Sequence, residues 1–160
     1  MHFAQETETI LIRAGATLSS VAATDIINME NYDKVTFIVT MGTVTTGGNI
    51  SIRQMDSVSD TVSAESRLAL DYYYEKTHSA SGSITKTSAD SISSYGGITV
   101  ADADDSKMYI FEVRGEMLTS SNNCVALYFD TSAFNATPVQ VTAVCHRARY
   151  KQTQPVTALA

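Results

Sequence analysis

Apolar and polar residues alternate with a period of two along most of this chain, and no segment sustains the period of about 3.6 residues that marks an amphipathic helix. The clearest run is KVTFIVTMG, residues 34–42, in which Val35, Phe37, Val39 and Met41 fall on one face. Because successive side chains of a strand point to opposite faces, this pattern predicts a strand with one buried side.

The same alternation predicts most of the other strands. They are expected at 24–31, 49–55, 67–76, 96–101, 108–113, 124–130 and 138–147. The segment 8–14 fits either a first strand or part of an N-terminal arm, residues 1–14, and residues 151–160 are expected to form a C-terminal tail. About eight strands without alternating helices pack best as a sandwich or barrel of the jelly-roll type. We therefore predict an all-β fold, a single jelly-roll-like β-sandwich domain over residues 1–160 with extended terminal arms.

A Gly-Gly pair in TTGGN, residues 45–49, predicts a tight hairpin between the clearest strand and the next one, because glycine readily adopts positive φ angles. Such a hairpin makes the two strands neighbours in one sheet. Alternation after the turn predicts Ile50 and Ile52 inside the sandwich, with Ser51 and Arg53 outside it.

Three consecutive tyrosines favour a strand over a helix at 67–76. Alternation makes at least one of Tyr72, Tyr73 and Tyr74 a core residue. The following segment, 77–94, consists mostly of Ser, Thr, Gly and Ala, and it is predicted to be an exposed excursion or a weak hairpin.

Composition narrows the class of protein. The 160 residues suit one domain, and the chain is 44% hydrophobic but only 18% charged, with 20 Thr and 18 Ser supplying most of its polarity. A net charge of −6 makes nucleic acid an unfavourable partner. No apolar run is long enough for a bilayer, so no membrane partner is expected. The N-terminus lacks the pattern of a secretory signal, so we expect synthesis in a cytoplasm.

Cys145 and His146 are adjacent in VCHRARYKQTQP, residues 144–155, and suggest a reactive site. A catalytic cysteine needs a base within hydrogen-bond reach, but neighbours on a strand point to opposite faces. We therefore predict a buried Cys145 and a His146 at the rim. If the last two strands form a hairpin centred near Phe134, Cys124 lies opposite Cys145, and we expect both thiols to be reduced.

Other patterns tied to chemistry do not occur in the sequence. A zinc site needs about four clustered Cys or His ligands. Asp102, Asp104 and Asp105 lack the later glycine and glutamate of a calcium loop, so a solvated turn is predicted there. Neither a P-loop nor a nucleophile elbow is present. We predict no catalytic residues, no metal and no cofactor, and the protein is not expected to be an enzyme.

Several longer stretches resemble one family. They are DIINMENYDKVTFIVTMGTV (25–44), GGITVADADDSKMYIFEVRGEML (96–118), NCVALYFDTSAF (123–134) and a last strand ending in Arg149 and Tyr150. Together they resemble the decoration, or cement, proteins of tailed-bacteriophage capsids. The resemblance implies a jelly-roll-like domain on the outside of the virion, made in the host cytoplasm, that bridges neighbouring major capsid subunits as a dimer or trimer. It implies no catalytic residues.

If the protein acts by binding another protein, exposed Tyr and Arg are the residues expected at the interface, because both are enriched in interface cores. The predicted contact residues are Tyr32, Arg147, Arg149, Tyr150 and Lys151. The three cations form a basic ridge at the end of the last strand, which suits a carboxylate-bearing neighbour. The alternative for the two tyrosines is that they close the ends of the sandwich.

A second function from another class is a carbohydrate- or receptor-binding β-sandwich module of a phage fibre or surface protein. It would use the tyrosine run 72–74 and the polar segment 77–94, since aromatic rings stack on sugars. The chain has no Trp, which counts against a broad aromatic platform.

Overall fold

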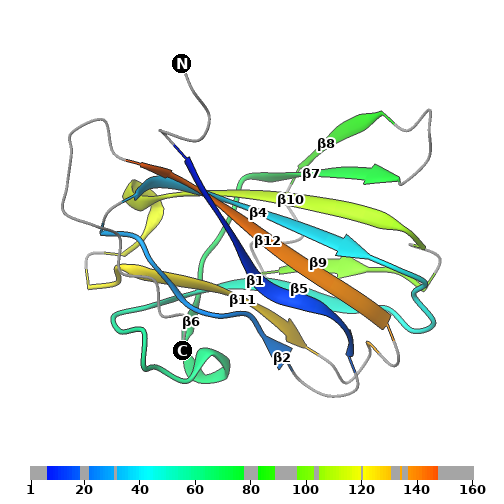
Figure 1. The fold of residues 1–160 in the computed structure, drawn as a ribbon, viewed down its shortest axis with the longest axis horizontal. Helices are drawn as coiled ribbons and strands as arrows, with labels where there is room; N and C mark the ends of the chain where they lie inside the picture. Colours follow the sequence, from blue (N-terminus) through cyan, green and yellow to red (C-terminus); the bar gives the residue numbers. More distant parts are fainter. Residues whose placement is uncertain are drawn as a thin grey trace.

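The computed structural model describes residues 7–18, 22–30, 32–77, 83–88, 97–102, 105–119, 121–130, 134 and 137–147 (Figure 1). Its strands form two antiparallel sheets. Sheet A has the order β1 (Thr7–Leu18), β12 (Thr137–Arg147), β4 (Tyr32–Met41), β10 (Lys107–Arg114), β7 (Tyr72–Thr77) and β8 (Ile84–Ser88). A membrane-spanning helix is absent from the described part of the chain.

Sheet B is centred on two strands, β11 (Cys124–Asp130) and β5 (Gly48–Met55). Two short strands, β2 (Ala22–Ala23) and β3 (Ile27–Asn28), pair with the free side of β11. Two others, β6 (Ser66–Arg67) and β9 (Gly97–Val100), pair with the free side of β5. Each edge of the sheet is therefore made of two short pieces.

The strand order is that of a jelly roll. The first and last strands pair with each other, and β1–β12–β4–β10 faces β2/β3–β11–β5–β9, so the chain changes sheet at nearly every connection. These eight strands, with β2 and β3 counted as one, give the two facing sheets that define the fold. The remaining strands β6, β7 and β8 are inserted between β5 and β9, and β7 and β8 extend sheet A beyond β10. The predicted all-β jelly-roll-like sandwich is confirmed.

The two sheets enclose one main core, and the strands bury in it the side that alternation predicts. Val35, Phe37, Val39 and Met41 of β4 are all buried, as the sequence predicts. From the opposite sheet, the inward residues of β5 and β11 meet them: Ile50, Ile52, Val125, Leu127 and Phe129. The segment 8–14 belongs to β1, with Ile10 and Ile12 in this core, so it is a first strand and not an arm.

The hairpin predicted at 45–49 is wrong. β4 lies in sheet A and β5 in sheet B, so this connection crosses between the sheets. Its glycines serve close approach, and neither adopts the left-handed φ region that a tight hairpin turn would need. A Cβ on Gly47 would lie 2.0 Å from the Val100 carbonyl oxygen, and one on Gly48 would lie 2.8 Å from the Phe134 ring.

The strand predicted at 67–76 is interrupted. The chain leaves sheet B after β6, crosses at residues 68–71, and joins sheet A as β7, while Leu68 and Leu70 are buried at the crossing. Tyr73 is the tyrosine of this run that lies in the core, where its ring packs beside the rings of Tyr109 and Phe111. Within the polar segment, residues Ile84–Ser88 form β8, which pairs with β7, so the tyrosine run and this segment together make the observed hairpin.

The outward side of sheet B carries a second, smaller core. Met55, Cys124 and Ala126 point outward and are buried beneath Val62 of the 3-10 turn η1 (Val62–Ala64). Ser51 and Arg53 on the same side are also buried, which contradicts the prediction that they are exposed. The chain between β5 and β6 folds back over the sheet, so both faces of β5 are covered.

Candidate protein-binding face

The outward side of sheet A, which we call the open face, is the candidate functional site. Residues directly opposite each other in an antiparallel pair share a face, so the strand register arranges this surface in rows. The middle row crosses five neighbouring strands and is apolar except for one threonine. It consists of Leu11, Thr142, Ile38, Ile110 and Tyr74.

Three further rows run parallel to the middle row. One side has Thr9, Val144, Thr36 and Glu112, followed at the sheet end by His146, Lys34 and Arg114. The other side has Gln140, Thr40, Met108, Lys76 and Ile84. Apolar side chains are therefore contiguous at the centre of the face, and charged ones lie toward its two ends.

None of these described open-face side chains is buried. Leu11 at one edge is 51% exposed and Ile84 at the other is 58% exposed, while Ile38 and Ile110 between them are half-buried by their sheet neighbours. An antiparallel sheet with one solvated side usually alternates apolar and polar residues. An apolar row on that side, interrupted once by Thr142, is the kind of exposed apolar surface that marks interaction sites.

Aromatic side chains extend the apolar centre toward the β7–β8 hairpin. Tyr72 and Tyr74 are half-buried on the open face, with ring centroids 5.5 Å apart and ring planes at 75°. This edge-to-face contact is a favoured aromatic geometry, which holds the two rings as a unit. Their phenol groups provide a polar handle beside the apolar row.

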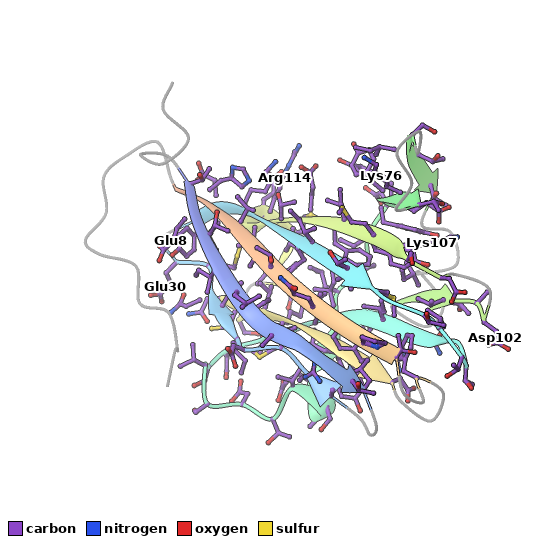
Figure 2. The ribbon with its side chains drawn as sticks, turned by 45° about the vertical axis from the view of Figure 1, so that its right-hand side comes forward. Glu8, Glu30, Lys76, Asp102, Lys107 and Arg114 are labelled. Atoms are coloured by element: carbon purple, nitrogen blue, oxygen red, sulfur yellow. The ribbon has the colours of Figure 1, made fainter. Side chains whose placement is uncertain are left out.

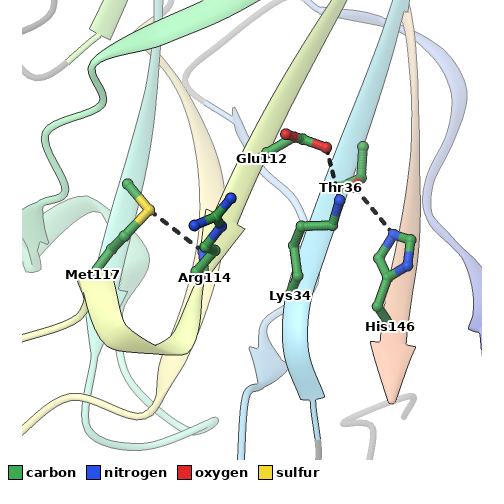
Figure 3. Close-up of polar contacts among 6 residues, drawn as sticks. All are labelled: Lys34, Thr36, Glu112, Arg114, Met117 and His146. Carbon is green, nitrogen blue, oxygen red and sulfur yellow. Dashed lines mark hydrogen bonds and ion pairs between the residues drawn. The ribbon is translucent and has the colours of Figure 1, made fainter. Parts of the chain in front are cut away.

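A small polar network occupies one end of the open face (Figure 3). The Lys34 ammonium lies 2.8 Å from the Glu112 carboxylate, and Thr36 Oγ1 lies 3.3 Å from His146 Nε2. Burial lowers the pKa of His146, and Lys34 lowers it further, while Glu112 acts in the opposite direction. The imidazole is therefore biased toward its neutral form. Arg114 pairs with the exposed Glu116 at 3.4 Å.

Charge is distributed unevenly between the two sides of the sandwich. The described charged groups of the open face are three cations and one carboxylate, Lys34, Lys76, Arg114 and Glu112, although the whole chain has a net charge of −6. Carboxylates gather on sheet B and its connections: Asp25, Glu30, Asp56, Asp60, Glu65, Asp71 and Asp130, against Arg53 and Arg67. Figure 2 shows Lys76 on the β7–β8 hairpin at one end of the molecule and Glu30 at the other.

The contact residues predicted from sequence lie elsewhere or outside the described residues. Tyr32 is 4% exposed, packs in the main core and donates a 2.8 Å hydrogen bond to Glu8. β12 ends at Arg147, opposite Tyr32, after a register shift that follows His146. The Arg147 side chain and residues 148–160, which include Arg149, Tyr150 and Lys151, lie outside the described residues.

The two cysteines are separated by the fold. Cys145 is buried in the main core, whereas Cys124 is buried on the outward side of sheet B, so the predicted hairpin that would oppose them does not form. Both are free thiols. Burial raises the pKa of Cys145 to about 12 and that of Cys124 to about 11. His146 points away from Cys145, to the open face, as strand geometry predicts.

The acidic turn after β9 has a structural role. Asp105 accepts a hydrogen bond from the Val44 amide at 2.7 Å, and Asp102 accepts one from the Gly47 amide at 2.5 Å. These carboxylates anchor the crossing between β4 and β5. Among the described residues, no three His, Cys, Asp or Glu side chains come together in a way that would hold a metal ion.

Comparisons with known proteins give only distant similarities. No family model and no curated protein matches the chain. Among solved structures, the SPBc2 prophage-derived protein YomS has a TM-score of 0.43 at 9% identity, covering 88% of this chain and 92% of that one. The coat protein of Tobacco streak virus has a TM-score of 0.38 at 9% identity, covering 97% of this chain and 95% of that one. The structure of Desmodium yellow mottle tymovirus has a TM-score of 0.34 at 11% identity, covering 93% of this chain and 89% of that one. At such low scores, the fold class rests on the strand order of the chain itself.

Sequence reasoning did not identify the open face. Each strand alone shows ordinary β-formers at these positions, such as Ile38 opposite the buried side of β4 and Ile110 opposite that of β10. Only the register of five strands aligns them in one row. The alternation of the tyrosine run was the one available signal, since it requires residues on both sides of the sheet.

Proposed function

We propose that the chain is a structural protein of a tailed-phage virion that binds the outside of the capsid and stabilises it by bridging neighbouring major capsid subunits. The observation that carries this proposal is the open face. A jelly roll that covers one outward side with its own chain but leaves an apolar row on the other is suited to contact with another protein. The stretches that resemble capsid decoration proteins, at 25–44, 96–118 and 123–134, support the same class.

The proposed mechanism is mass action. A domain that binds only the assembled shell stabilises that shell by RT ln(1 + [L]/Kd) at each site. An interface of about 800 Å² on each partner is the usual size for a specific complex, and a six-stranded sheet face offers a surface of that kind. Many copies would distribute the resistance to internal pressure over the lattice.

Further contacts are proposed from the basic end of the last strand. Arg147, Arg149, Tyr150 and Lys151 follow His146 in sequence, and exposed Arg and Tyr are favoured in interface cores. Tyr32 no longer belongs to this set, because a side chain that is 4% exposed offers little area to a partner. A homo-oligomer, dimer or trimer, synthesised in the host cytoplasm, completes the proposal.

Co-sedimentation tests the proposal most directly. The purified chain is mixed with expanded, undecorated capsids of the phage that encodes it, and the shells are then challenged by heat or low salt. We expect the chain to sediment with the shells and to prolong their survival. Absence of binding to the expanded shell, with binding elsewhere on the virion, would contradict the proposal.

A carbohydrate-binding module is the second candidate, because Tyr72 and Tyr74 lie half-exposed together on the open face. Stacking of a sugar ring needs an accessible aromatic face, but the edge-to-face contact turns one ring edge toward its neighbour. A glycan array separates the two candidates. Clear saccharide binding by the isolated chain, lost in Tyr74→Ala, would favour this second function over capsid binding.

A further inference from the structure

We infer that two copies of the chain associate through the outer edge of β8, with the two β8 strands paired antiparallel so that the two A sheets become one. This inference rests on the proposed function, because it names the surface that forms its homo-oligomer. The feature that carries it is β8, Ile84–Ser88, the last strand of sheet A beyond β7. Figure 1 shows the β7–β8 hairpin projecting from the body of the sandwich.

The outer edge of β8 is available for strand pairing. Among the described residues, β8 pairs with β7 alone, and its five residues align with β7 without a register shift. An edge strand presents a row of backbone N–H and C=O groups on the side away from its neighbour. Water satisfies these groups in the free chain, and the protein element that matches the whole row is another extended strand.

The other edges of the described sheets are protected against the same pairing. β1 has two register shifts along β12, and its Ile12 carbonyl accepts a 3.2 Å hydrogen bond from the Asp25 amide. The Arg13 guanidinium donates a 3.3 Å hydrogen bond to the Ala23 carbonyl, which ties the same strand to β2. On sheet B, each edge consists of two pieces of two to four residues. Bulges, covering segments and short strands all block edge-to-edge association, so the edge that remains for a second copy is β8.

The strand is also solvated on both faces. Ile84 is 58% exposed on the open face, and Thr85, which points to the other face, is exposed as well. A strand that has one neighbour and buries little area gains much from a second neighbour. Ile84, Thr85 and Thr87 are β-branched, which favours an extended conformation in both copies.

Two-fold symmetry fixes the arrangement of the pair. When two identical strands pair antiparallel, the axis is perpendicular to the sheet and passes beside one residue, which faces its own copy. An axis at Lys86 would place two like charges opposite each other, which is unfavourable, so the axis lies at Thr85 or Thr87. Both open faces then point to the same side, and the pair is able to lie on one capsid surface. Because each copy uses its β8, association ends at two copies.

Sedimentation equilibrium of the full chain, without capsids, tests the inference. The interface is small, so we expect a weak dimer that forms between about 1 µM and about 1 mM chain. Thr85→Lys with Thr87→Lys places like charges at the axis and should raise the Kd of the dimer about tenfold or more. The matched control is Thr9→Lys with Thr17→Lys, which makes the same change at two exposed positions of β1 and should leave the Kd unchanged. The urea midpoint of each variant checks its folding.

Cysteine cross-linking locates the axis. Thr85→Cys, Lys86→Cys and Thr87→Cys are prepared one at a time and treated with oxidised glutathione where the wild type is dimeric. Only the residue beside the axis has its own copy within the Cα separation that a disulfide spans, about 4.4–6.8 Å. We expect a disulfide-linked dimer from one of the two threonine variants. None is expected from Lys86→Cys or from wild type, whose Cys124 and Cys145 are buried.

Three results would overturn the inference. They are a wild-type chain that stays monomeric at about 1 mM, a dimer that the β8 and β1 variants weaken equally, and cross-linking at Lys86→Cys or at none of the three positions. Capsid binding is measured separately. A monomer that binds expanded shells overturns this inference alone, whereas a dimer formed through β8 that binds no shells contradicts the proposed capsid role alone.

Discussion

The outward sides of the two sheets carry similar apolar residues, but they differ in whether other parts of the chain cover them. On sheet B, Met55, Cys124 and Ala126 are fully buried beneath Val62 of the chain that joins β5 to β6. On sheet A, Met108 and Ile110 occupy equivalent outward positions and remain half-buried.

This difference has a physical reason. Apolar area that is removed from water stabilises the fold by about 25 cal/mol per Å², so the covered side of sheet B contributes to folding. The open face makes the smaller contribution, and the area it leaves exposed is available to a partner. One outward side of the sandwich therefore stabilises the fold, and the other leaves apolar area exposed, as the proposed contact function requires.

The largest expected effect comes from a matched pair of methionines. Met55→Ala leaves a cavity beneath η1 and should lower the free energy of unfolding by about 2–5 kcal/mol. Met108→Ala on the open face removes a half-buried side chain and should cost about 1 kcal/mol. Urea denaturation of both variants measures the difference. Equal losses would show that the two sides do not differ as described.

A second prediction concerns the cover over sheet B. The Arg53 guanidinium lies 4.8 Å from the centroid of the Tyr128 ring and donates a 2.6 Å hydrogen bond to the Glu65 carbonyl. Arg53→Ala should destabilise the protein by about 1–3 kcal/mol, because it removes the cation–π contact and leaves the Glu65 carbonyl without this donor. Arg67→Ala, on the exposed neighbouring strand, serves as the control.

Hydrogen exchange gives the local readout for the same pair. Amides of residues 56–65 should exchange faster in Arg53→Ala than in wild type or in Arg67→Ala, because the covering segment loses one of its attachments. Unchanged exchange in this segment would contradict the assigned role of Arg53.

The cysteines test burial on both sides of sheet B. Burial raises the pKa of Cys124 to about 11 and that of Cys145 to about 12, so both thiols are neutral at moderate pH. Native chain should react with iodoacetamide about a hundredfold more slowly than chain unfolded in urea, because the thiolate is the nucleophile. Rapid alkylation of native Cys145 would indicate a reactive site after all.

The same shifts predict how stability depends on alkaline pH. A raised pKa in the folded protein means that the unfolded chain loses its thiol protons first, so the stability contributed by the buried neutral thiols is complete below the ordinary thiol pKa of 9.0. It is lost as the pH rises through the window up to about 11 for Cys124 and about 12 for Cys145. Urea midpoints measured across this range should fall, and Cys124→Ala should fall less steeply than wild type.

The smallest effects are expected in the polar network of the open face. Glu112→Gln should change stability by about 0–1 kcal/mol, because the Lys34 pair is partly exposed. The same change should lower the pKa of His146 further, and Lys34→Met should raise it, since Glu112 and Lys34 act on it in opposite directions. NMR titration of the imidazole measures both, and a shift in the reverse direction would contradict the geometry. Because the pKa of His146 in the folded protein lies below 6.5, the stability that comes from its neutral imidazole is lost as the pH falls below 6.5.

Much of the fold was predictable because alternation is a local property. The buried side of β4, the core position of one tyrosine in the run, and the opposite directions of Cys145 and His146 all follow from the period of a strand. These inferences needed no knowledge of which strand pairs with which.

The sequence by itself therefore determined the class, an all-β sandwich, and which side of most strands faces inward. Only the tertiary structure decided that the Gly47–Gly48 connection crosses between sheets, that Ser51 and Arg53 are covered, and that Cys124 and Cys145 lie apart. It also decided that isolated β-formers on five strands meet in one apolar row. The reason is that each of these features depends on the pairing of distant segments, and strand pairing carries no signal in the residues of one strand alone.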